Sequence, residues 1–117
     1  MRLEVVARKV LDSGDLDRAG QLAEELLAKS PDSVTGLMIA GYVAASKNQF
    51  DKAEAFYSRI PDLPDPMALE ARCFFAQLLL FDRGRAAQAE KIYRRILEHN
   101  SEHGLALQGL ASLMEAE

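Results

Sequence analysis

The chain has 117 residues, about the length of one average domain, of which 49% are hydrophobic and 27% are charged. This composition is typical of a folded globular protein and excludes disorder as the main state of the chain. A single cysteine, Cys73, excludes a disulfide framework and the metal modules that use several cysteines. The formal net charge of −4 has the wrong sign for a protein dedicated to nucleic acid.

No targeting or membrane-spanning segment is expected. The N-terminal residues interrupt their apolar side chains with Arg2, Glu4 and Arg8 too soon for a secretory signal. The most apolar stretch, residues 73–81, contains Gln77 and is far shorter than the roughly 20 residues of a membrane helix. We therefore expect a cytoplasmic protein without membrane insertion.

Apolar residues recur at intervals of three and four residues along the whole chain, which is the period of an α-helix. The stretches with this period are 3–11, 16–27, 37–44, 50–60, 73–80, 86–97 and 107–114. No stretch of four or more residues alternates convincingly between polar and apolar side chains, as a half-buried strand would. The spacing therefore predicts an all-α chain.

The helical stretches form a repeat. An alanine in every second helix, and a turn residue five positions before it, recur with spacings of 34 and 36 residues. The alanines are Ala19, Ala53 and Ala89, and the turn residues are Gly14, Asn48 and Gly84. Glycine and asparagine are the residues that most readily adopt the left-handed backbone at a helix end. We expect one domain of three helix pairs, at about 2–33, 34–67 and 68–101, followed by a single helix at about 103–116.

Two loops mark where helices begin. The segment 30–33, Ser-Pro-Asp-Ser, supplies an N-cap for the helix that follows it. Asp65 is an N-cap type, and Pro66 follows it in the first turn, where its missing N–H costs nothing. The run 61–66 is rigid and accounts for the two extra residues of the second repeat.

This pattern resembles the tetratricopeptide repeat, a helix–turn–helix unit of 34 residues. The second repeat matches the family best, with Leu37, Ala40, Gly41, Ala44, Ala53 and Tyr57. The resemblance implies a right-handed superhelical solenoid of antiparallel helix pairs, with about three units plus a C-terminal capping helix. Small residues let paired helices approach closely, and large residues fill the layer between pairs. The capping helix is expected to have a polar outer face at Gln108, Ser112 and Glu115.

The resemblance also implies a concave surface, lined by the first helix of each pair, where family members bind ligands. Residues one step beyond the packed stripes of these helices are expected to face it. The candidate peptide-binding groove consists of Glu4, Arg8, Leu11, Met38, Tyr42, Phe74, Leu78 and Phe81. Its apolar, aromatic end favours an amphipathic helix or a peptide with hydrophobic anchors. The alternative for Phe74, Leu78 and Phe81 is that they are core residues beneath the last helix.

No residues suggest a catalytic, cofactor or metal site. His99 and His103 are four residues apart, but the Glu that directly follows the first histidine of a zinc protease is absent, and a turn is expected between them. Cys73 occupies a core position of its repeat, with no histidine or cation at helical spacing to activate it. The glycines are isolated, so there is no phosphate-binding loop. We expect no enzymatic activity and no cofactor.

The sequence predicts a non-catalytic protein–protein interaction module that binds a peptide or helix of a partner and forms part of a larger chain or assembly. One alternative is a small cytosolic chaperone that shields an apolar segment of a secretion or assembly subunit. Another is a regulatory segment fused to a catalytic domain. The expected partner is a protein or peptide and no nucleic acid, and the chain is expected to be a monomer or a weak homodimer.

Overall fold

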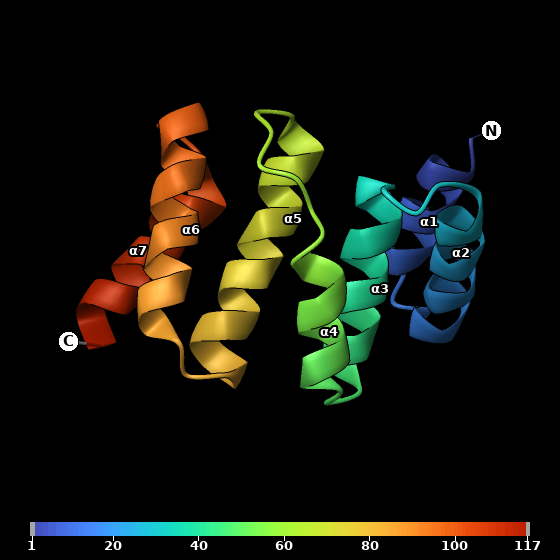
Figure 1. Cartoon of the computed structure of the whole chain (residues 1–117), viewed down its shortest axis with the longest axis horizontal. Coiled ribbons are helices and arrows are strands. Elements are labelled where there is room, and N and C mark those ends of the chain that lie inside the picture. The colour runs from blue at the N-terminus through green and yellow to red at the C-terminus, as the bar shows by residue number, and fades with distance from the viewer. Residues whose placement is uncertain (1, 117) are drawn as a thin grey trace. The chain divides into compact units, whose positions relative to one another are not determined.

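The computed structural model describes residues 2–116, and every regular element in that part of the chain is helical. The elements are α1 (Leu3–Asp12), α2 (Leu16–Lys29), α3 (Val34–Ser46), α4 (Phe50–Tyr57), α5 (Pro66–Gln77), the π-helix η1 (Leu78–Asp82), α6 (Ala86–His99) and α7 (Gly104–Ala116) (Figure 1). The prediction of an all-α fold is confirmed. The chain divides into two compact units between Ile60 and Pro61, which we call the first and second unit.

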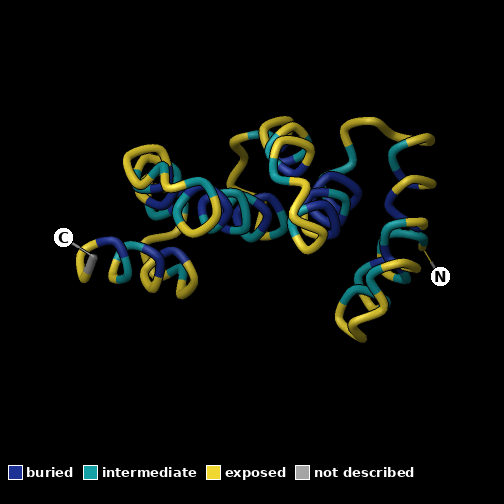
Figure 2. Tube along the Cα trace, turned by 90° about the horizontal axis from the view of Figure 1, so that it is seen from below, coloured by how far each residue is buried: buried dark blue, intermediate teal, exposed yellow. Residues whose placement is uncertain are grey.

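The first unit contains α1 to α4, drawn from blue to green in Figure 1. Each helix packs against the next one in the chain, and α1 also contacts α3. Helix α3 therefore has three neighbouring helices, α1, α2 and α4. Its residues Leu37, Met38 and Ile39 are fully buried. Figure 2 shows the same arrangement, with buried residues on the inner sides of the helices and exposed residues outside.

The turn and cap residues act as the sequence predicts. Gly14 and Gly84 have φ of 90° and 67°, and Asn48, at φ 62°, is the only other described residue with a positive φ. The Ser33 hydroxyl accepts a hydrogen bond from the backbone N–H of Gly36, at 3.1 Å, and so caps α3. The carboxylate of Asp65 caps α5 in the same way. Local residue chemistry therefore fixes these helix ends.

Each unit contains a glycine that allows a tyrosine ring to lie directly against a helix backbone. A Cβ added at Gly41 in α3 would lie 2.4 Å from Cε1 of Tyr57, which is 2% exposed. A Cβ added at Gly109 in α7 would lie 2.1 Å from Cζ of Tyr93, which is fully buried. Such separations are far below ordinary van der Waals contact, so only glycine fits either position.

The second unit contains α5, η1, α6 and α7, of which α7 packs on both α6 and α5. Its buried core consists of Leu69, Cys73, Ala76, Leu79, Ala89, Tyr93, Ile96, Ala106 and Leu113. The outer side of α7 is less polar than expected, because Leu107 and Met114 are 48% and 68% exposed beside Gln108 and Glu115. The helix carries more apolar residues than one packed face can cover.

The π-helix η1 is the element that the sequence pattern misses. A regular α-period places Leu80 in the packed stripe that begins at Cys73. Instead, the backbone N–H of Arg83 bonds to the carbonyl of Leu78, at 3.0 Å, and this wider turn changes the phase of the helix. Leu79 takes the buried place in the stripe as a result, whereas Leu80 is only half-buried.

An ion pair ties the loop that precedes α5 to α6. The carboxylate of Asp62 accepts hydrogen bonds from Nε of Arg95, at 2.7 Å, and from Nε2 of His99, at 2.8 Å. The bonds from Arg95 and His99 lower the pKa of Asp62 from 3.8 to about 2. Since all three groups lie near the surface, the pair contributes only a small stabilisation.

We expect this small stabilisation to decrease at low pH. Because the pKa of Asp62 is lower in the folded state, its contribution is fully present above its ordinary pKa of 3.8 and is lost as the pH falls toward 2. The free energy of unfolding of Asp62→Asn should therefore differ from that of the wild type at pH 6, and differ less at pH 3. Urea titrations at both pH values measure this, and an undiminished difference at pH 3 would contradict the assignment.

Candidate functional site

The predicted groove residues of the first unit lie on α1 and α3, which contact each other. Glu4, Arg8 and Leu11 on α1 are half-buried, and Tyr42 on α3 is 39% exposed. We call these four residues the first-helix face. Met38 is fully buried, which corrects the expectation for this residue: it belongs to the interior because α3 is enclosed by three neighbouring helices.

Some of the predicted groove residues of the second unit are exposed and one is buried. Phe81 in η1 is 66% exposed and Phe74 in α5 is half-buried, so both present ring surface. Leu78 is only 2% exposed, on the same helix face as the buried Ala71 seven residues before it, and it cannot line a groove. The burial of Leu78 corrects the expectation that it lines the groove.

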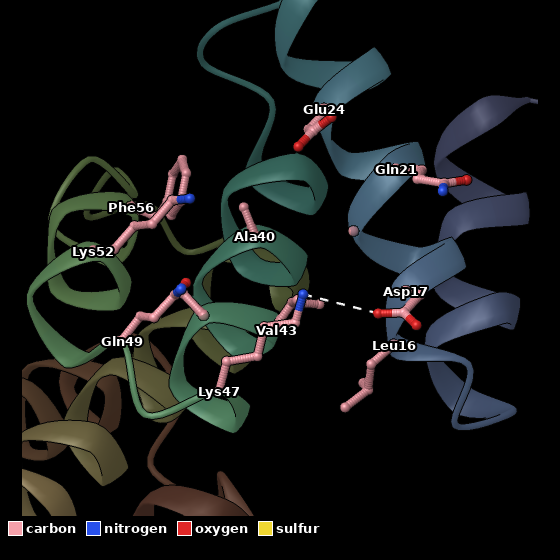
Figure 3. Close-up of a pocket in the computed structure, with 12 residues that line it drawn as sticks. Leu16, Asp17, Gln21, Glu24, Ala40, Val43, Lys47, Gln49, Lys52 and Phe56 are labelled. Atoms are coloured by element: carbon pink, nitrogen blue, oxygen red, sulfur yellow. Dashed lines mark ion pairs between the residues drawn. The ribbon is translucent and has the colours of Figure 1, made fainter.

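The first unit also contains a hollow that the sequence does not predict. It lies among α2, α3 and α4 and has a volume of about 380 Å³ (Figure 3). Its lining residues are Leu16, Asp17, Gly20, Gln21, Glu24, Ala40, Val43, Ala44, Lys47, Gln49, Lys52 and Phe56. We call it the α2–α4 trough, because these two helices form its walls and α3 forms its floor.

The trough has an apolar floor and walls of opposite charge. Val43 and Ala44 are almost completely buried beneath it. Asp17, Gln21 and Glu24 line the wall on α2, whereas Gln49, Lys52 and Phe56 line the wall at α4 (Figure 3). At one end Nζ of Lys47 lies 3.8 Å from the carboxylate of Asp17. The only sequence signal of this site is Gly20, which has no side chain and lies among polar residues of α2. Those polar residues alone would indicate a solvated helix face.

The structure brings together a cysteine and a histidine that sequence spacing keeps apart. Sγ of Cys73 in α5 lies 3.8 Å from Nδ1 of His103, in the connection before α7. The same Nδ1 atom lies 3.4 Å from the backbone N–H of Ala106, and so caps α7 as an acceptor. Burial raises the pKa of the Cys73 thiol to about 12, so the thiol stays protonated and is not a nucleophile. The contact is structural.

The two histidines serve different helices, because His99 bonds to Asp62 while His103 caps α7. Among the described residues, no group of three or more His, Cys, Asp or Glu side chains is placed to hold a metal ion. Within residues 2–116, no helix has both the length and the apolar character needed to cross a bilayer.

The thiol of Cys73 should react slowly while the second unit is folded. Because the side chain is fully buried and its pKa is about 12, we expect the reaction with an aromatic disulfide reagent at pH 8 to be at least about a hundredfold slower than in the urea-unfolded chain. The absorbance of the released thiolate measures both rates. A native rate like that of an exposed thiol would show that α5, α6 and α7 do not enclose Cys73.

The helix pairs, the left-handed turns and the glycine–tyrosine contacts define a helical-repeat fold. The family model described as tetratricopeptide repeat matches residues 7–68, just over half of the sequence. The chain belongs to the tetratricopeptide repeat family, whose domains generally mediate protein–protein interaction.

A solved structure, that of the MamA D159K mutant, resembles the fold with a TM-score of 0.68 and 20% sequence identity. The match covers 97% of this chain but 65% of the MamA chain, so this chain spans slightly less than two thirds of that length. Comparison with curated proteins gives no match. At this identity the likeness to MamA concerns the fold alone.

Proposed function

We propose that this chain is a non-catalytic interaction module that binds a peptide or helix of a partner protein on its first-helix face. The observation that carries the proposal is the exposure of Tyr42. Helix α3 buries Leu37, Met38 and Ile39 completely, yet Tyr42 is 39% exposed. An aromatic side chain that emerges from an otherwise packed helix is a typical anchor for a partner, since it supplies a large contact area at little entropic cost.

The charged residues on α1 complement this anchor. Arg8 forms an exposed pair with Asp12, at 3.1 Å, and Glu4 forms one with Arg2, at 3.0 Å. Pairs of this kind contribute about 0–1 kcal/mol, so a partner's charged group can replace either member at little cost. The first-helix face therefore offers both an apolar anchor and exchangeable charges.

The second unit offers apolar contact surface of its own. Phe81 is 66% exposed, and Phe74 is half-buried on the helix that precedes it. We propose these two residues as a contact surface of the second unit alone, whereas Met38 and Leu78 are omitted because they are buried.

Charge introduced at the exposed rings should abolish partner capture. We expect Tyr42→Lys and Phe81→Lys each to reduce the amount of partner captured from the source organism, identified by mass spectrometry, by at least about tenfold. Leu63→Lys is the matched control, because Leu63 is 46% exposed in a loop outside the proposed surface. Far-UV circular dichroism should be unchanged in all three. Full capture by Tyr42→Lys would refute the first-helix face, and full capture by Phe81→Lys would refute the contact surface of the second unit.

A further inference from the structure

We propose that the α2–α4 trough is a second protein-binding surface, separate from the first-helix face. Its occupant is an amphipathic helix of a partner protein, with an apolar face flanked by basic residues along one edge and acidic residues along the other. The proposal concerns the first unit alone. It depends on the shape of the trough, on its apolar floor and on the opposite charges of its walls.

The floor of the trough suits apolar side chains. Ala40, Val43 and Ala44 face it from α3, and Gly20 contributes no side chain from α2. A Cβ added at Gly20 would meet Cγ1 of Val43 at 3.5 Å, so the two helices are in close contact where the floor meets the wall. The volume of about 380 Å³ accommodates a few side chains of a docking segment, but not a whole helix. A partner helix would therefore lie along the trough and insert only its apolar face.

The walls have the geometry of a helix-binding groove. The residues that line α2 are spaced at four and three positions, at 17, 21 and 24. Those at α4 are the N-cap residue 49 and, within the helix, 52 and 56, four positions apart. Each wall is therefore a ridge on one face of a helix, and α3 lies between the two ridges (Figure 3). A third helix packs into such a groove with residues at i, i+3, i+4 and i+7.

The charges of the walls define the edges of the partner. Glu24 on α2 and Lys52 on α4 lie on opposite sides of α3 (Figure 3), and neither has a hydrogen-bond or ion-pair partner among the described residues. Asp17 and Lys47 already face each other across one end of the trough. A helix with a basic edge along α2 and an acidic edge along α4 would complement both walls, whereas a helix with two edges of the same charge would be repelled by one of them.

Three synthetic helical peptides test the proposal on the intact chain. They share one apolar face of leucine and alanine and differ in their edges: one lysine edge and one glutamate edge, two lysine edges, or two glutamate edges. Because a helix can enter the trough in either direction, the mixed peptide satisfies both walls in one of its two orientations. Fluorescence anisotropy should show that it binds at least about fivefold more tightly than either of the others.

Charge reversal of one wall should change which peptide binds most tightly. Glu24→Lys replaces the unpaired acid of the α2 wall with a base, while Asp17 stays paired with Lys47, so the glutamate-edged peptide should then bind best. Lys52→Glu makes both walls acidic, so the lysine-edged peptide should then bind best. The matched controls are Glu25→Lys and Lys29→Glu, which make the same changes of net charge at exposed positions of α2 outside the trough. In both controls the mixed peptide should remain the tightest binder.

Two results would overturn the proposal. One is failure of the mixed peptide to bind the wild type more tightly than the other two peptides. The other is a change in peptide preference that is the same in the trough variants and in their controls, because this would report net charge alone. The Tyr42→Lys variant separates this proposal from the proposed function, since it should lose partner capture on the first-helix face and still bind the mixed peptide.

Discussion

Gly41→Ala should destabilise the protein by about 1–3 kcal/mol, although alanine is the better helix former. The added Cβ would lie 2.4 Å from Cε1 and 2.6 Å from Cδ1 of Tyr57. That ring is 2% exposed, so it cannot move toward solvent without losing its packing. Urea unfolding followed by circular dichroism measures the change.

Gly20→Ala is the control for this prediction. Its Cβ would make only ordinary contact with Val43, at 3.5 Å, so the gain in helix propensity should stabilise the protein by about 0.5–1 kcal/mol. Tyr57→Leu should reduce the cost of Gly41→Ala, because it removes the ring atoms that the new Cβ meets. Equal stability of Gly41→Ala and the wild type would show that α3 and α4 do not pack as closely as described.

Ile96→Ala should destabilise the protein by about 2–5 kcal/mol, since Ile96 is fully buried in the core of the second unit and truncation would leave a cavity. Ile92 precedes it by one helical turn but is only partly buried. Ile92→Ala should therefore cost less, although it removes the same atoms. Urea titrations of both variants measure the difference. If the two costs were equal, α6 would not have the orientation described here.

Most of the fold could be predicted from the sequence because its signals are local. A glycine or asparagine placed just after an apolar stripe fixes a helix end, as Gly14, Asn48 and Gly84 do with positive φ. The N-caps at Ser33 and Asp65 act in the same way. A period of 34 to 36 residues then relates one helix pair to the next, and that period carries the resemblance to the family.

The features that the sequence did not reveal depend on contacts between helices. A π-turn is one residue wider than an α-turn, and no residue type marks it, so the sequence pattern places Leu80 rather than Leu79 in the packed stripe. Met38 is buried because α3 has three neighbours, which a pattern on one helix cannot show. Cys73 and His103 meet only through the packing of α7 on α5.

The α2–α4 trough was missed for a related reason. Polar residues at helical spacing, such as Asp17 and Glu24, have the same pattern on a solvated face and on the wall of a groove. Only the position of the neighbouring helix distinguishes the two. The apolar pattern of the first helices nevertheless indicated Tyr42 and Phe81, which are exposed aromatic residues.

The two proposals place partner segments on different sets of helices. The first-helix face depends on α1 and α3, whereas the trough walls belong to α2 and α4. Variants of Tyr42 should therefore change binding at the first-helix face alone, and variants of Glu24 binding at the trough alone, because the two residues share no contact partner in either proposal.

The most direct test of the proposed function is residue-resolved. The segment bound by the captured partner should be added to the isotopically labelled chain, and the amide chemical shifts should be followed by NMR. We predict that the largest shifts occur on α1 and α3, around Arg8 and Tyr42. A bound segment that leaves the amides of both helices unchanged would contradict the assignment of the first-helix face as the binding surface.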